Sequence, residues 1–456
     1  MGDVPTPECP NCKRLEARVA ALEAEIARLC RDSSNSHKPP SSDIVKPKAP
    51  RAPDGKKRTI GGQPGHPRHE RAPFAPDQID ETCLYELTRC PGCGGLLRAA
   101  SALPRVLQQV ELVERPIVVT EHRAPAYWCA RCHRLQRAWL PADFAAAGLV
   151  GTRLTAFIAW LKGAAHASYA TIQALLRDVL GVQLSSGQLV RLVRKVSGAL
   201  DPAYGKLRQA LPGEARLNVD ETGHKERGKN LWTWCFRAPG YTLFKIDPSR
   251  GSQVLLETLG KDFDGVLGCD YFSAYRKYMG EMDTQVQFCL AHLIRDVRFL
   301  TTLDGATRKY GARLLGRLCR LFRVIHRRDK MSQERFQWAL ERQRKEIVRA
   351  ARHPPWTAPA RNMAERFRQH ADAYFRFITT PGLEPTNNLA EQALRFVVID
   401  RRITQGTRGT AGRAWCERIW TTAATCRQQG RSVFDFLHSA LDAYFTGQPA
   451  PSLLPA

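Results

Sequence analysis

The sequence lacks an apolar run of about 18 residues or more, and its N-terminus lacks the apolar core of a secretory signal. The first absence argues against a transmembrane helix, and the second argues against export through a signal peptide. We therefore expect a cytoplasmic protein that makes no use of a membrane.

Acidic residues are also in short supply. Asp and Glu number 44 against 69 Lys and Arg, which gives a formal net charge of +25. A basic excess of this size favours nucleic acid or another polyanion as a partner. It carries no information on sequence specificity, because phosphate contacts position a protein without reading bases.

The chain is long and contains many apolar residues and cysteines. The 456 residues, 43% of them hydrophobic, allow a packed interior and are too many for one small core, so we expect about two to four domains. In a cytoplasmic protein the 14 cysteines favour free thiols or zinc ligands over disulfides.

Residues 13–30 carry apolar side chains at alternating steps of four and three, the pattern of a short coiled-coil seam. A coiled coil would serve self-association, and the alternative is an amphipathic helix that docks on the chain's own core. The seam consists of Leu15, Val19, Leu22, Ile26 and Leu29. Cys9 and Cys12, just before it, form a lone Cys-x-x-Cys motif whose role the sequence leaves open.

Residues 31–76 are rich in Ser, Pro, Lys and Arg and cannot bury enough apolar surface to fold alone. We expect a flexible basic linker here. Lys56, Lys57 and Arg58 could lie along a DNA backbone, and an ordinary solvated linker explains the same composition equally well.

Two Cys-x-x-Cys pairs, Cys90 with Cys93 and Cys129 with Cys132, flank a strand-like segment within residues 77–145. Four thiolates can surround one Zn²⁺ tetrahedrally. The spacing between the pairs is longer than in the commonest zinc pattern. Because four protein ligands leave no open coordination position, we expect a structural zinc-binding module.

Residues 150–205 have the pattern of helices. Two of them, at 169–180 and 186–195, follow each other at helix-turn-helix spacing, with Gln188, Arg191 and Arg194 expected on the outer face of the second. A DNA-reading helix is one interpretation, and a plain helical hairpin fits the spacing as well.

From Gly213 onward the pattern changes to strands. Three strands are expected at 214–220, 231–237 and 241–246, followed by a helix and two further strands at 264–270 and 285–290. This is the order of an RNase H-like mixed sheet, in which the first and fourth strands lie side by side. Asp220 and Asp270 end these two strands, so the fold would bring them together.

A third acid, Glu391, opens a predicted helix that Asn387 or Asn388 can cap. Three carboxylates suit two Mg²⁺ ions, which prefer oxygen ligands and can activate a water or a 3′-hydroxyl for attack on a phosphodiester. Taken singly, an acid at a strand end is more often a turn residue or a helix cap.

Four motifs carry a resemblance to a known family: Asn218-Val-Asp-Glu-Thr222, Leu267-Gly-Cys-Asp-Tyr-Phe-Ser-Ala-Tyr275, Cys289-Leu-Ala-His-Leu-Ile-Arg295 and Pro385-Thr-Asn-Asn-Leu-Ala-Glu-Gln-Ala-Leu-Arg395. They resemble transposases of the insertion-sequence-66 family, and the upstream zipper and zinc module occur in the same order there. The resemblance implies that Asp220, Asp270 and Glu391 are a catalytic DDE triad on Mg²⁺, for which Mn²⁺ can substitute.

The resemblance also implies an α/β multidomain architecture. The RNase H-like core would comprise residues 213–297 and 383–446, and a helical insertion would occupy 298–382. Within the third motif, His292 is either a metal or active-site support residue or a satisfied structural histidine. After the Glu391 helix, Arg401, Arg402 and Arg408 lie in a basic stretch with glycines that could cradle phosphates.

The expected function is DNA transposition: strand cleavage at the ends of an insertion sequence by a metal-bound water, then strand transfer by the freed 3′-hydroxyl. The partners would be the terminal inverted repeats, target DNA, a second copy of the chain and accessory proteins of the same element. One alternative is a zinc-containing DNA-binding protein without catalysis, either a regulator or a decayed transposase. The other is a metal-dependent nuclease that cuts without joining.

Overall fold

The computed structural model describes residues 72–96, 98, 106–114, 116–138, 148–303 and 305–455. The predicted coiled coil at 13–30, the pair Cys9 and Cys12, and the basic residues Lys56, Lys57 and Arg58 lie outside the described residues and stay predictions. The chain divides into two compact units, a small one of Ala49–Glu121 and a large one that includes His122–Ala456. Each unit is described by itself.

The small unit has little regular structure among its described residues. It contains a 3-10 helix, η2 (Pro76–Gln78), and an isolated antiparallel bridge between Arg89 and Leu96. The large unit begins with a two-stranded hairpin, β1 (Ala126–Cys129) and β2 (Arg134–Arg137).

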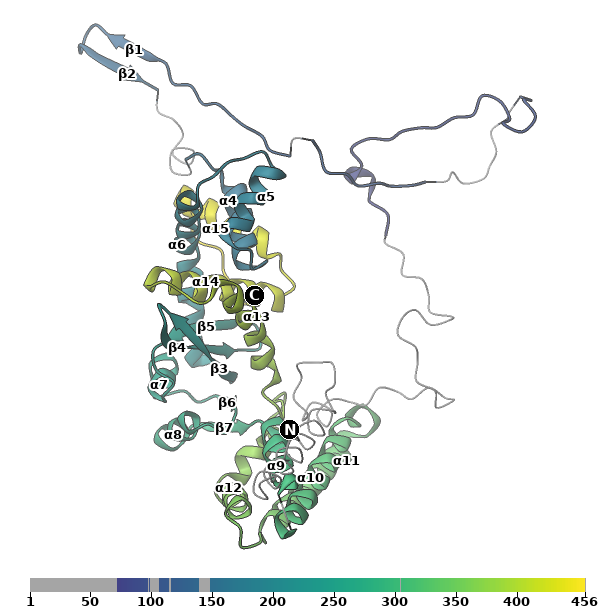
Figure 1. Cartoon of the computed structure of the whole chain (residues 1–456), viewed down its shortest axis with the longest axis vertical. Helices are drawn as coiled ribbons and strands as arrows, with labels where there is room; N and C mark the ends of the chain where they lie inside the picture. The colour runs from purple at the N-terminus through teal and green to yellow at the C-terminus, as the bar shows by residue number, and fades with distance from the viewer. Residues whose placement is uncertain are drawn as a thin grey trace, which may run out of the picture. The chain divides into compact units, whose positions relative to one another are not determined.

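A five-stranded mixed sheet forms the centre of the large unit (Figure 1). Its strand order is β5-β4-β3-β6-β7. The strands β3 (Arg216–Glu226), β4 (Lys229–Arg237) and β5 (Thr242–Asp247) are antiparallel neighbours, whereas β6 (Val266–Cys269) and β7 (Gln285–Phe288) run parallel to β3. The predicted mixed sheet is confirmed, with its first and fourth strands side by side.

The first strand is longer than we predicted. The expected strand ended at Asp220, but β3 continues to Glu226 because it pairs with β4 down to a tight turn. Arg227 and Gly228 form that turn with positive φ angles of 48° and 80°, the geometry that matches the right-handed twist of a hairpin. Asp220 therefore lies inside a strand, level with the end of the shorter strand β6.

One helix completes the open edge of the sheet. Along α14 (Thr410–Gln428), three side chains spaced one turn apart accept hydrogen bonds from backbone N–H groups of the edge strand β5. The acceptor and donor residues are Thr425 with Thr242, Thr421 with Phe244, and Glu417 with Ile246, at 3.1, 3.0 and 2.6 Å. The edge is thereby closed to pairing with another strand.

The helices before the sheet are anchored in two cores. In α6 (Ser186–Ala210) the first turns pack with α4 (Thr152–Gly163) and α5 (Tyr169–Asp178), whereas the later turns enter the main core. The helix predicted at 186–195 was therefore too short. Arg191 and Arg194 are exposed as expected, but Gln188 accepts a hydrogen bond from Ser185 N in a capping box at the helix start.

The remaining helices of the core flank the sheet and the N-terminal helices. They are η3 (Leu211–Gly213), α7 (Gln253–Leu259), α8 (Ser273–Met282), α13 (Asn388–Thr404) and α15 (Val433–Thr446). α13 lies against β3 and β4, and α15 lies against α4 and α6.

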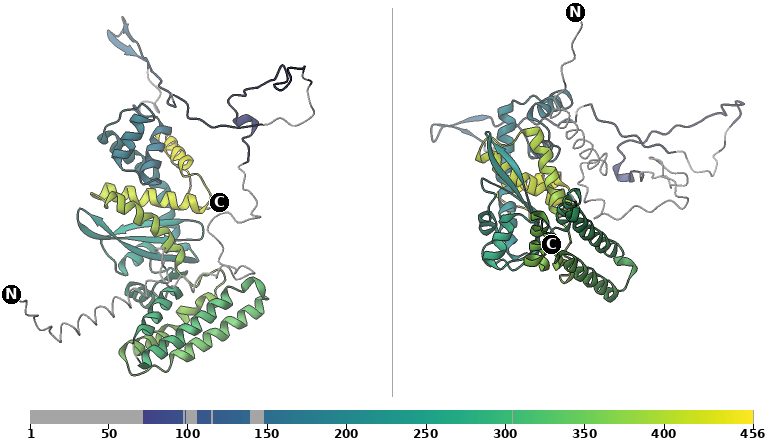
Figure 2. Two further views of the ribbon diagram at one scale, coloured as in Figure 1. Left: turned by 45° about the vertical axis from the view of Figure 1, so that its right-hand side comes forward. Right: turned by 60° about the horizontal axis from the view of Figure 1, so that its bottom comes forward.

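Between β7 and α13 the chain is helical, and these helices gather at one end of the large unit in Figures 1 and 2. They are α9 (Leu290–Thr302), α10 (Gly305–Ile325), η4 (Arg328–Lys330), α11 (Gln333–Ala351), α12 (Ala358–Phe375) and η5 (Arg376–Ile378). One apolar face of α10 is buried, with Leu314, Leu318 and Leu321 inaccessible to solvent. Among the residues that the structure describes, no helix is both long and apolar enough to cross a membrane.

The edge contact of α14 gives a first prediction. Thr421→Val keeps the shape of the side chain but leaves the buried N–H of Phe244 without an acceptor, so we expect a loss of about 1–3 kcal/mol in unfolding free energy. The control is Thr446→Val, because the exposed Thr446 hydroxyl bonds only to Asp442 O of its own helix. Urea unfolding of both variants is the measurement, and equal stabilities would contradict this role of α14.

Candidate functional site

The parallel pairing of β3 with β6 places two of the three predicted acids together. Leu217 is level with Leu267 and Asn218 with Gly268, so Asp220 and Asp270 follow at the same register position. A side chain at Gly268 would come within 2.6 Å of Asn218 Nδ2, which explains the glycine there. Backbone N–H groups orient both carboxylates: Glu221 N donates to Asp220 Oδ1, and Phe272 N donates to Asp270 Oδ1, each at 2.9 Å.

The third acid, Glu391, lies in the first turn of α13, as predicted. The preceding residue Asn387 fastens this helix to the sheet: its Nδ2 donates to Val219 O at 2.8 Å, and its Oδ1 accepts from Asn218 Nδ2 at 3.0 Å. We expected the side chain of Asn387 or Asn388 to cap the helix. Asn387 does occupy the N-cap position, but its side chain makes no cap bond because it is used by β3.

The backbone of Asn387 is also held from the other side. Its N–H donates to the Sγ of Cys289, which follows β7, at 3.1 Å, and Leu290 N donates to Pro385 O at 2.9 Å. The start of α13 is thus tied both to β3 and to the end of β7, far apart in the sequence. Burial raises the pKa of Cys289 to about 12, so its sulfur is a neutral thiol here.

The three acids are close enough to influence one another electrostatically. Burial raises the pKa of Asp220 well above its usual range, and the charges of Glu221, Asp270 and Glu391 raise it further. A cation placed among these carboxylates would favour their charged forms instead.

Glu221 is a member of this acidic group that we did not predict. Its side chain is 1% exposed and accepts hydrogen bonds from Arg250 Nε at 2.8 Å and from the Tyr275 hydroxyl. The Arg250 guanidinium lies between the rings of Trp232 and Phe272, 4.4 and 4.0 Å from their centroids. The one sequence signal for Glu221 was its place directly after Asp220, on the opposite face of the strand.

His292 lies beside the third acid. Its Nδ1 is 3.6 Å from Glu391 Oε1 and has no hydrogen-bond partner among the described residues. The ligand atoms of Cys289, His292 and Glu391 all lie within 4.8 Å of one another. Of the two interpretations of His292, this geometry favours active-site support over a satisfied structural histidine.

The predicted phosphate cradle is only partly a loop. Arg401 and Arg402 belong to the last turn of α13, and the Arg401 Nη1 donates to Thr222 Oγ1 of β3 at 3.3 Å. After the helix, Thr407 N donates to Lys225 O at 2.9 Å, so this backbone N–H is not available to a phosphate. Arg402 and Arg408 are exposed. The loop is docked on the β3–β4 hairpin, so phosphate contacts in this stretch stay a prediction that concerns the arginine side chains.

Gly406 makes that docking possible. Its φ is +90°, and a Cβ atom there would come within 2.0 Å of Lys225 O. The docked loop also covers His224, whose Nε2 lies 3.1 Å from Thr407 Oγ1 and whose side chain is buried.

The cysteines of the predicted zinc module form two tight turns, one in each unit. Gly94 N donates to Cys90 O at 2.8 Å, and His133 N donates to Cys129 O at 2.9 Å. Backbone N–H groups at Cys93 and Gly92 lower the pKa of Cys90, and those at Cys132 and Arg131 lower the pKa of Cys129. All four cysteines are free thiols, so both turns fit zinc ligation.

Known protein families match both parts of the chain. Residues 147–414, more than half of the sequence, match the family described as "Transposase IS66 family". The chain belongs to the IS66 transposase family. Residues 88–133, which contain all four zinc-module cysteines, match the zinc-finger binding domain of transposase IS66. Both matches confirm the resemblance found in the sequence.

This IS66 family member shows two further similarities, one in its N-terminal region and one over most of its length. Residues 10–72 match a family of unknown function. An uncharacterized protein, y4qI, from Sinorhizobium fredii is 24% identical over 436 residues, which cover 87% of this chain and 78% of the relative.

The buried His224 gives a prediction for pH dependence. Burial and the nearby Arg401 lower its pKa to about 4, whereas an unfolded histidine titrates near pH 6.5. Because the unfolded chain takes up this proton first as the pH falls, the unfolding free energy should drop by about 3 kcal/mol between about pH 6.5 and 4.

The matched variants are His224→Gln, which cannot titrate, and His353→Gln at an exposed position. Urea unfolding at a series of pH values should give a flatter profile for His224→Gln than for the wild type, and an unchanged profile for His353→Gln. Parallel profiles for all three proteins would contradict the assignment.

Proposed function

We propose that this member of the IS66 family is a DDE transposase that cuts and joins DNA at the acid group Asp220, Asp270 and Glu391. The observation that carries the proposal is the placement of Asp220 in β3, Asp270 directly after β6 and Glu391 in the first turn of α13, where burial and the charges of neighbouring acids raise the pKa of Asp220. Three antiparallel strands followed by two parallel ones are consistent with an RNase H-like core.

The side chains fit divalent cations. Carboxylate oxygens are the ligands that Mg²⁺ prefers, and one or two protein carboxylates per ion are enough. We assign Asp220, Asp270 and Glu391 as the residues that would hold two Mg²⁺, or Mn²⁺ in its place. When bound, such ions activate the attacking oxygen and stabilise the leaving oxygen of a phosphodiester.

The protein's own residues would keep these ligands in place. Glu221, held by Arg250 and Tyr275, fixes the segment of β3 next to Asp220. Asn387 fixes the position of the Glu391 helix relative to β3 through its bond to Val219 O. His292, beside Glu391, is assigned as a positioning residue for that carboxylate.

DNA ends and target DNA are the proposed partners, with Arg401, Arg402, Arg408 and the upstream Lys56, Lys57 and Arg58 as backbone contacts. Zn²⁺ on Cys90, Cys93, Cys129 and Cys132 would be structural. Apolar side chains of this region are mostly exposed, with Tyr85 at 93% and Val118 at 91%, so a metal rather than a core would hold it together. We further propose that the protein self-associates, that it works with accessory proteins of the same element, and that it acts in the cytoplasm.

A second candidate is a DNA-binding protein that does not catalyse. The zinc-finger match and the net charge of +25 favour it as much as they favour an enzyme. The acid group argues against it, because neighbouring carboxylates that repel one another destabilise a fold that has no cation to bind.

Cleavage assays test the proposed function directly. With Mg²⁺ and labelled DNA carrying the inverted repeats that flank its gene, the wild type should give both nicked and joined strands. Asp270→Asn should abolish both products and keep DNA binding. Asp283→Asn is the control, since Asp283 is an exposed acid in the left-handed conformation that Asn adopts easily.

Nicks without joined strands would identify a nuclease. Binding without any product, even with accessory proteins added, would favour the non-catalytic candidate. Full activity in Asp270→Asn would overturn the assignment of the site.

The anchoring role of Asn387 gives a separate prediction. Asn387→Ala removes the bonds to Val219 and Asn218, so Glu391 should lose its fixed position and Mg²⁺ affinity should fall by about tenfold or more. Asn388→Ala, one residue on, removes an amide that makes no side-chain hydrogen bond among the described residues. The shift of melting temperature with Mg²⁺ concentration measures the affinity, and equal shifts for the two variants would contradict the role of Asn387.

A further inference from the structure

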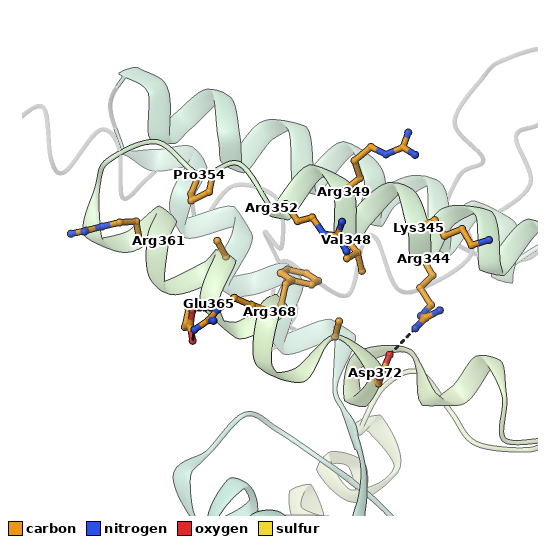
Figure 3. A pocket seen from close by; sticks show the side chains of 13 residues that line it. Arg344, Lys345, Val348, Arg349, Arg352, Pro354, Arg361, Glu365, Arg368 and Asp372 are labelled. Atoms are coloured by element: carbon orange, nitrogen blue, oxygen red, sulfur yellow. Dashed lines mark hydrogen bonds and ion pairs between the residues drawn. The ribbon is translucent and has the colours of Figure 1, made fainter.

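A groove with a strongly basic rim lies between α11 and α12, outside the acid group. Its volume is about 750 Å³, and Val348 and Phe367 contribute apolar surface to its lining. Figure 3 shows its basic side chains on both helices and on the segment that joins them. They are Arg344, Lys345, Arg349, Arg352, Arg361 and Arg368.

The acids of the groove do not balance this charge. Glu365 is paired with Arg368 and Asp372 with Arg344, each at a shortest N···O distance of 2.7 Å or less. Among the described residues, Lys345, Arg352 and Arg361 form no ion pair. Arg349 is 79% exposed and only reaches Glu346 at 3.9 Å. Four cations of the groove are therefore left for a partner.

Basic residues on helices are usually just solvated, and α10 offers examples in the exposed Arg320 and Arg323. The groove differs because cations from two helices and from the segment that joins them line one concave space. Like charges brought together lower the stability of a fold, and a bound polyanion would remove that penalty.

The spacing of the cations fits a phosphate backbone. Lys345, Arg349 and the C-cap residue Arg352 follow one another at steps of four and three, so they lie on one side of α11 and its C-terminal end. They span about 10 Å along the helix, over which duplex DNA presents about six phosphates. Guanidinium groups bind phosphate oxygens through paired N–H donors.

The helix α12 lines the groove and also contacts a residue next to one of the three acids. On another part of this helix, the Arg366 guanidinium lies 3.9 Å from the ring centroid of Tyr271, and Tyr374 stacks on the same ring. Tyr271 directly follows Asp270. α12 therefore contacts both the groove and the loop that carries the second acid.

We propose that this groove binds the sugar-phosphate backbone of duplex DNA while the acid group acts on the same DNA. The inference rests on the proposed function for its partner, and it adds a binding surface outside the acid group and the Arg401 region. Because phosphates carry no sequence information, the groove should bind any duplex equally well.

The test compares two double variants of the full-length, zinc-loaded chain in the Asp270→Asn background, where no strand is cut. Arg349→Gln/Arg352→Gln removes two groove cations, and Arg320→Gln/Arg323→Gln removes two exposed cations of α10. Affinity for a duplex with the element's end and for an unrelated duplex is measured at several salt concentrations.

The groove variant should bind both duplexes about tenfold or more weakly at about 0.1 M salt, with a salt dependence that is shallower by about one to two units of slope. The α10 variant should stay within about twofold of its parent. Unchanged binding of the groove variant, an equal loss in the α10 variant, or a loss for one duplex only would each overturn the proposal.

The outcome is separable from that of the proposed function. If wild-type protein cuts DNA with Mg²⁺ but the groove variant binds as its parent does, the groove proposal alone fails. If the groove variant loses binding but the wild type never cuts, the proposed catalysis fails and the groove remains a DNA-binding surface.

Discussion

The placement of several acids at one end of the sheet is the constraint on which the rest of the structure depends. Asp220, Asp270 and Glu391 come from three parts of the chain; burial makes the charged form of Asp220 unfavourable, and the neighbouring acids add to this effect. Such a group persists only where the surrounding contacts fix each acid in place. The parallel register of β3 and β6 fixes the two aspartates, and the Asn218–Asn387 bridge fixes the helix of Glu391.

The rest of the large unit stiffens this arrangement. β3 extends well past Asp220, because its long antiparallel ladder with β4 ends only at the tight turn. On the far edge, threonine and glutamate side chains of α14 replace a further strand. On the β6–β7 side, α12 packs around Tyr271, the neighbour of Asp270. Each contact restricts the movement of an element that carries an acid.

The order of strands and helices and the positions of the three acids could be predicted from the sequence. The interactions between residues far apart in the chain could not. Apolar residues before Asp220 and Asp270 and the start of the Glu391 helix are local signals, and the structure brings these three acids together as expected. The length of β3 was underestimated, because Glu221, Thr222, Gly223 and His224 break the apolar alternation and are held by pairing with β4. Arg401 and Arg402 were expected in a basic stretch with glycines, but they belong to the last turn of α13. The helix continues this far because it packs on β3 and β4.

Contacts between distant segments have no local signature. The hydrogen bonds of Glu221 to Arg250 and Tyr275 join β3 to two later parts of the chain. The side-chain amide of Asn387 binds β3 and does not cap its own helix. By contrast, the zinc-finger region could be predicted from cysteine spacing alone, because each pair of cysteines forms its own turn. A charge of +25 indicated a polyanionic partner, but only the structure reveals that cations of α11 and α12 line one groove.

The most direct measurement is anomalous X-ray scattering from crystals of the zinc-loaded protein with DNA and Mn²⁺ in place of Mg²⁺. If the three acids form a catalytic metal centre, manganese peaks should lie within coordination distance of carboxylate oxygens of Asp220, Asp270 and Glu391. If manganese binds elsewhere and these carboxylates keep only protein contacts, the account of the site is wrong.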